Sequence, residues 1–154
     1  MPDNSVEDCK ICAMGQPGTN DTVFHDDLWS AGIGPGMEVP GWIVLRTSRH
    51  TELITGIDDA EAATLGTRAR DLASALSEVT GAQRVYQMAF GENHPHYHLL
   101  ITARPETLPA ARRGGKILSL LDDGAVDEAA ARTLIPRIRA AYEQIRATAG
   151  QVAS

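Results

Sequence analysis

The clearest pattern along the chain is helical and covers residues 58–80. Its apolar residues recur three or four positions apart and so form one stripe: Leu65, Ala69, Leu72, Leu76 and Val79. Asp58 and Glu61 have the spacing of a capping box, and Gly81 suits the left-handed position that follows a helix end. The sequence therefore predicts a long helix that buries one face.

A second helical pattern covers residues 127–149. Four of its apolar residues fall on one face: Leu134, Ile138, Tyr142 and Ile145. Pro136 lies within this pattern, where a proline removes one helical hydrogen bond and clashes with the preceding turn. We therefore expect a second helix that is kinked or split in its first third.

Shorter apolar runs on both sides of the first helix have the composition of strands. They cover residues 22–25, 28–31, 42–45, 85–90 and 96–103. Asp26 and Asp27 suit a hairpin turn, residues 32–41 are rich in glycine and proline as loops are, and the polar residues 46–50 predict another turn. The order of these elements predicts an α+β domain on a mainly antiparallel sheet.

The composition narrows the possible function classes. The 154 residues fit one domain, and the formal net charge of −6 argues against binding to nucleic acid polymers or anionic membranes. A small phosphorylated ligand stays compatible with this charge. No stretch approaches the roughly 20 apolar residues that a membrane span needs. Residues 1–5 lack the basic and apolar parts of a secretory signal, so we expect a cytoplasmic protein.

Three of the five histidines lie within five residues, at His94, His96 and His98. Residues two apart share one face of a strand, so these side chains are expected to converge on one surface. The alternate residues would face the core: Tyr97, Leu99 and Ile101. Because imidazole can act as nucleophile, proton shuttle or metal ligand near neutral pH, this run is the predicted functional site.

Both cysteines of the chain lie together, as Cys9 and Cys12. In a cytosolic protein this spacing favours metal binding or redox chemistry over a structural disulfide. No strand pattern precedes the pair, which makes a thioredoxin-like role the weaker option. Two cysteines supply half of a tetrahedral zinc site, and the histidine run is the obvious source of further ligands. A pair of free surface thiols is the alternative.

Taken in order, these segments resemble the histidine-triad superfamily, which includes the galactose-1-phosphate uridylyltransferases. The resemblance covers residues 9 to about 121 and rests on residues 9–12, 24–29, 40–45, 49–50, 58–80, 85–86 and 90–92, the histidine run and Arg104. It implies a histidine-triad-like antiparallel sheet with a long helix packed on it, in a domain of residues 1–125 with an N-terminal zinc-binding segment. Residues 126–154 would be a C-terminal helical extension. The family usually pairs two sheets, which implies a homodimer.

The signature of the family, His-φ-His-φ-His-φ-φ with φ apolar, fits the run in two registers. One takes His94, His96 and His98 as the three histidines. The other makes His96 the first and His98 the central histidine, and puts Leu100 in place of the third. We favour the second register, because it also matches the residues on both sides without a gap and starts the strand after Pro95.

By resemblance, the activity is that of a nucleotide hydrolase or nucleotidyltransferase acting at the α-phosphate of a nucleoside phosphate derivative. The central histidine attacks phosphorus and forms a nucleotidyl-histidine intermediate. This nucleophile is His98 in the favoured register and His96 in the other. Leu100 can neither donate a hydrogen bond nor carry charge, which opens the alternative of a zinc-stabilised nucleotide-binding protein with weakened or lost catalysis.

Four further residues are candidates for contacting the substrate. His94, Asn93 or Arg104 could replace the missing third histidine near the phosphate. Asp27 falls in a region that often contacts ribose in the family.

The resemblance also implies a zinc site. Uridylyltransferases and some bacterial histidine-triad proteins bind zinc through two N-terminal cysteines, a histidine after the second strand block and the first signature histidine. Here these residues are Cys9, Cys12, His50 and His96, with His94 replacing His96 in the other register. Four protein ligands fill a tetrahedral zinc ion, so its role would be structural.

Overall fold

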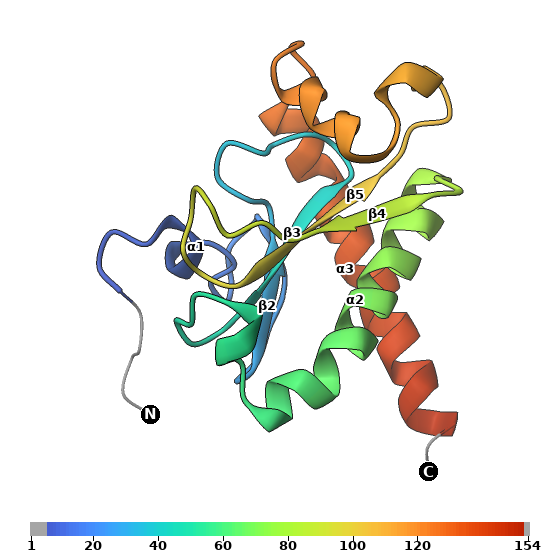
Figure 1. Ribbon diagram of the computed structural model, residues 1–154. Helices are drawn as coiled ribbons and strands as arrows, with labels where there is room; N and C mark the ends of the chain where they lie inside the picture. The colour runs from blue at the N-terminus through green and yellow to red at the C-terminus, as the bar shows by residue number, and fades with distance from the viewer. Residues whose placement is uncertain (1–5, 153–154) are drawn as a thin grey trace.

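Short runs rich in β-branched and aromatic residues pair into a five-stranded antiparallel sheet (Figure 1). The computed structural model describes residues 6–152. The strands are β1 (Thr22–His25), β2 (Trp29–Gly32), β3 (Trp42–Thr47), β4 (Val85–Met88) and β5 (His98–Ala103), in the order β1-β2-β3-β5-β4. The helices are α1 (Lys10–Ala13), α2 (Asp59–Thr80) and α3 (Glu128–Val152), with 3₁₀ helices η1 (Ile54–Gly56), η2 (Ala110–Arg112) and η3 (Gly114–Leu121). The predicted α+β class is confirmed.

Local signals define both ends of α2, as predicted. The Asp58 carboxylate accepts a hydrogen bond from the Glu61 amide, and the Glu61 carboxylate accepts one from the Asp58 amide. Gly81 ends the helix in the left-handed region at φ 75°. The predicted stripe packs into the core, with Ala69, Leu72 and Leu76 buried and Leu65 and Val79 partly buried.

The helix α3 lies on the same side of the sheet as α2 (Figure 1). Its buried residues Ile138 and Tyr142 belong to the same core as the sheet and α2, and the ring of Tyr142 stacks on Phe24 of β1 at 4.6 Å. The helix runs through Pro136 without a break, so of the two expected alternatives the split helix is wrong. The division between residues 1–125 and 126–154 stays a prediction.

The opposite face of the sheet is covered at one end by the segment that contains η2 and η3, drawn in orange in Figure 1. Its apolar residues pack with alternate residues of β3 and β5. We call this group the minor core; its buried members are Met14, Val39, Trp42, Val44, Leu100, Leu108 and Ile117. The core under α2 and α3 is called the helix-side core, and it includes Trp29, Ala31, Leu45, Leu72, Ile101 and Ile138.

Several strand ends differ from the prediction. Arg46 and Thr47 are buried residues of β3, so the predicted turn at residues 46–50 is wrong in its first two positions. β4 ends at Met88 instead of residue 90. β5 begins at His98 instead of His96, because the Tyr97 amide donates to the Thr51 carbonyl outside the sheet at 2.6 Å. Within residues 6–152, no helix has both the length and the apolar character needed to cross a bilayer.

Candidate functional site

Four side chains converge where the N-terminal segment meets the sheet: Cys9, Cys12, His50 and His96. Their donor atoms all lie within 4.8 Å of one another. The Cys12 sulfur is 3.4 Å from Nδ1 of His50 and 3.3 Å from Nδ1 of His96, and the Cys9 sulfur is 3.6 Å from the latter. Tetrahedral zinc with ordinary bond lengths would hold sulfur and nitrogen about 3.6 Å apart. The group can therefore hold a metal ion without large movement.

Local structure turns both sulfurs to the same side. Cys9 precedes α1, and its Sγ accepts a hydrogen bond from the Cys12 amide at 3.3 Å. Burial raises the pKa of the Cys12 thiol, so this thiol is protonated at neutral pH in the metal-free protein. A metal ion has to displace that proton, which makes binding depend on pH.

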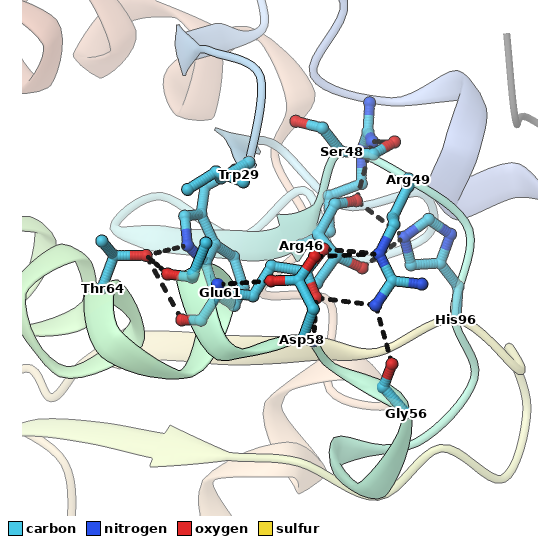
Figure 2. Close-up of polar contacts among 12 residues, drawn as sticks. Trp29, Arg46, Ser48, Arg49, Gly56, Asp58, Glu61, Thr64 and His96 are labelled. Atoms are coloured by element: carbon cyan, nitrogen blue, oxygen red, sulfur yellow. Dashed lines mark hydrogen bonds and ion pairs between the residues drawn. The ribbon is translucent and has the colours of Figure 1, made fainter. Parts of the chain in front are cut away.

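His96 is fully buried, and its ring is oriented by the backbone of β3. Its Nε2 lies 2.8 Å from the Thr47 carbonyl oxygen, which can only accept, so Nε2 carries the hydrogen (Figure 2). The lone pair of Nδ1 then faces the sulfurs. Burial, aided by the charges of Arg46 and His50, lowers the pKa of His96 to about 4. The ring is thus neutral at pH 7, the form that binds metal ions.

Arg46 holds the cysteine segment against the sheet, and this role was missed from the sequence. Its side chain is 1% exposed. All of its N–H groups point to carbonyl oxygens at 2.8–3.3 Å: those of Cys12 and Met14 in the cysteine segment, and those of Thr47 and Ser48 at the end of β3. Arg46 lies two residues after Val44 and therefore on the same face of an apolar strand. This position could have indicated that its side chain is buried.

His98 begins β5 opposite Arg46 in the strand register. Its Nδ1 donates to the His96 carbonyl oxygen at 2.5 Å, which leaves the lone pair on Nε2. Burial lowers the pKa of His98, and the nearby charge of His94 lowers it further. His98 is therefore a neutral imidazole with an unused basic nitrogen, the state that a histidine nucleophile requires.

The remaining predicted site residues lie outside the donor group. His94 lies close enough to His98 to affect its pKa, and Asn93 is exposed in the same loop. Asp27 is exposed in the β1–β2 turn. Arg104 follows the far end of β5, six residues after His98, which is about 20 Å along an extended strand. His94 and Asn93 thus lie in the loop that leads into β5, whereas Arg104 lies beyond the other end of that strand.

Comparison with known proteins identifies the fold. No protein-family model matches the sequence, and no curated protein is similar to it in sequence. Solved structures do match: a hypothetical histidine triad nucleotide-binding protein from Sulfolobus tokodaii has a TM-score of 0.67 and 16% identity over 90% of this chain and 92% of that chain. The chain has the histidine-triad fold.

Two other solved structures share this fold. A zinc-bound histidine triad family protein from Mycobacterium smegmatis has a TM-score of 0.63 and 18% identity, over 92% of this chain and 97% of that one. A uridylyltransferase has a TM-score of 0.61 and 18% identity, over 88% of this chain but only 45% of that one. The histidine-triad fold is therefore shared with a zinc-bound protein and with part of a larger transferase.

The donor group contains His96 and not His94, as the favoured register expects, and the register itself stays a prediction. Leu100, which this register puts in place of the third histidine, is 4% exposed and packs in the minor core beside Val44 and Ile117. Arg46 has no donor left for a ligand there, since its N–H groups are all engaged with carbonyl oxygens.

Proposed function

We propose that the protein is a nucleotide hydrolase or nucleotidyltransferase that acts at the α-phosphate of a nucleoside phosphate derivative, with His98 as nucleophile. The observation that supports this most directly is the hydrogen bond from Nδ1 of His98 to the His96 carbonyl oxygen. It fixes the tautomer in which Nε2 carries the lone pair, and burial keeps the ring neutral.

The chemistry follows from that tautomer. The Nε2 lone pair of His98 attacks phosphorus, an Nε2–phosphorus bond forms, and the leaving group departs with its bonding electrons. The ring becomes positively charged, and the His96 carbonyl stabilises its Nδ1–H. Water or an acceptor hydroxyl then attacks phosphorus and releases its proton to solvent, and the electrons of the Nε2–phosphorus bond return to the ring. His94 and Asn93 are the proposed phosphate contacts, while Asp27 stays a candidate for ribose.

We propose that Cys9, Cys12, His50 and His96 hold a zinc ion. Two thiolates and two imidazoles are a preferred zinc donor set, and the donor spacing supports it. With four protein ligands the ion is structural. By fixing His96, the site also fixes the carbonyl oxygen to which His98 donates. We further propose a cytoplasmic homodimer.

Leu100 supports a second candidate function. Its apolar surroundings supply no donor to the developing charge on phosphorus. A zinc-stabilised protein that binds nucleotides with little or no turnover is consistent with this.

The test uses a fluorogenic adenosine phosphoramidate, a dinucleoside polyphosphate and a nucleoside diphosphate sugar as substrates. Wild type is expected to turn over at least one of them, and His98→Ala to lose at least about a thousand-fold in kcat/KM. His25→Ala, at an exposed histidine of β1, is the control and should keep full activity.

Three other outcomes separate the alternatives. Binding of nucleotide without turnover by wild type favours the binding protein. Activity that survives His98→Ala but is lost in His96→Ala, with zinc retained, makes His96 the nucleophile. A wild type that neither binds nor turns over any substrate of the panel would contradict both functions.

A further inference from the structure

Arg49, the neighbour of the metal donor His50, is held by the first turn of α2. Its Nε donates to one Glu61 carboxylate oxygen at 2.7 Å, and its Nη2 donates to the other at 2.9 Å. Nη2 also donates to the Gly56 carbonyl oxygen at 2.7 Å. Figure 2 shows the Arg49 guanidinium between the helix and this loop. Such a bidentate ion pair fixes the orientation of the guanidinium as well as its distance from the carboxylate.

Glu61 serves two purposes with one carboxylate. It is only 1% exposed, and besides Arg49 it accepts a hydrogen bond from the Asp58 amide at 2.8 Å, closing the capping box (Figure 2). The beginning of a helix also favours a negative charge. The start of α2 and the position of Arg49 therefore depend on the same group.

Both ends of the segment that carries His50 are also attached. On one side, the Ser48 hydroxyl donates to the Asp26 carbonyl oxygen at 2.6 Å. On the other side, the Thr51 carbonyl oxygen accepts from the Tyr97 amide, next to the donor His96. Between them, Arg49 is the side chain that links this segment to a helix.

We propose that Glu61 and Arg49 are positioning residues of the metal centre, which place His50 and so couple the first turn of α2 to metal affinity. This rests on the metal-binding part of the proposed function and not on its chemistry at phosphorus. Groups that hydrogen-bond a metal ligand from outside the donor set typically change affinity 10- to 100-fold when removed. Arg49 and Glu61 reach His50 through the backbone, so we expect the lower end of this range. Coupling is reciprocal, so a bound ion also stabilises the first turn of α2.

The same helix offers a matched control. Asp71 is also a buried α2 carboxylate, and it pairs with Arg70 at 2.9 Å and with Arg146 of α3 at 3.0 Å. These contacts lie on the α3 side of the molecule and involve none of the donor residues. Glu61→Gln and Asp71→Asn each remove one buried negative charge from α2 with little change in shape.

The experiment measures zinc affinity by competition with a chromophoric chelator, on metal-stripped protein whose folding is checked by circular dichroism. Glu61→Gln is expected to weaken zinc binding about 10-fold. Asp71→Asn should stay within about threefold of wild type, although both variants lower Tm. In wild type, zinc should slow hydrogen exchange of the Glu61 amide, and Glu61→Gln should abolish this effect.

Arg49→Lys keeps the charge but loses the planar fork, so it should weaken zinc binding by an intermediate factor. It also carries the test if Glu61→Gln does not fold. Equal losses of affinity in Glu61→Gln and Asp71→Asn, or unchanged affinity in Arg49→Lys, would overturn the inference. A wild type that binds no zinc overturns it together with the metal centre, whereas a zinc-binding protein inert to nucleotides overturns only the proposed reaction.

Discussion

The two faces of the sheet use neighbouring residues of the same strands for different purposes. Towards the helices, Leu45 and Ile101 are buried among apolar side chains. Towards the other side, Leu100 packs in the minor core, while Arg46 and His98 lie further along the same two strands, near the metal-donor group. We call the part of the sheet around Arg46, His96 and His98 the polar end. It is stable because backbone carbonyl oxygens accept hydrogen bonds from these buried charged and imidazole groups. One face is thus apolar along these strands, and the other is divided between apolar packing and the polar residues near the donor group.

The largest effect on stability is expected from metal. Free zinc at a thousand times its Kd should raise the free energy of unfolding by about 4 kcal/mol. The measurement is urea unfolding with zinc and with excess chelator. The double variant Cys9→Ser, Cys12→Ser should not respond to either addition. An identical response in wild type and in this variant would contradict the assignment of the donor group.

Adjacent truncations on β5 compare the two faces directly. Ile101→Ala opens a cavity in the helix-side core, and Leu100→Ala opens one in the minor core, so each should cost about 3 kcal/mol. Only Leu100→Ala should accelerate proteolysis within residues 105–125, because those residues cover that face. Urea unfolding and limited proteolysis followed by mass spectrometry measure both effects. Equal cleavage of this segment in the two variants would show that the faces are not independent.

Lowering the pH should lower the free energy of unfolding through the histidines of the polar end. The pKa of His96 is about 4 in the folded protein and about 6.5 in an unfolded chain, so the unfolded chain takes up the proton first. The metal-free protein should keep its full stability above pH 6.5 and lose about 2 kcal/mol between pH 6.5 and 5. The lowered pKa of His98 adds in the same direction.

Urea unfolding in chelator at several pH values measures this loss. His96→Gln should reduce the dependence to the part that His98 contributes, whereas His25→Gln, at an exposed position, should retain all of it. The same slope in both variants would place the titrating groups elsewhere.

The smallest effect on stability is expected from a substitution at the edge of the helix-side core. Phe24→Leu removes the stacking on Tyr142 but keeps most of the apolar bulk, and should cost about 1 kcal/mol. Zinc content, measured by atomic absorption, should not change, because the stack lies on the opposite face. A loss of zinc in this variant would mean that the two faces are coupled.

Features that depend on neighbouring residues were predictable from the sequence. The capping pair Asp58 and Glu61 and the terminal Gly81 define α2 locally, and the structure has them as expected. The donor set of Cys9, Cys12, His50 and His96 also comes together as the resemblance implied. Its roles as zinc ligands, and that of His98 as nucleophile, stay predictions.

Features that depend on distant partners and carry no motif of their own were not predictable. The polar residues 46–50 suit a turn, but Arg46 is buried because carbonyl oxygens more than thirty positions earlier, in Cys12 and Met14, accept from it. The surroundings of Leu100 depend on where Ile117 of η3 docks, which no local pattern encodes.

The donor group also bears on folding kinetics. A metal ion there would join Cys9 to His96, which are 87 positions apart in the chain. Closing such a loop has an entropic cost, and donors from separate segments have to be assembled before one ion can join them. Ligation would therefore follow the transition state. A bound ion would slow unfolding and leave the refolding rate nearly unchanged.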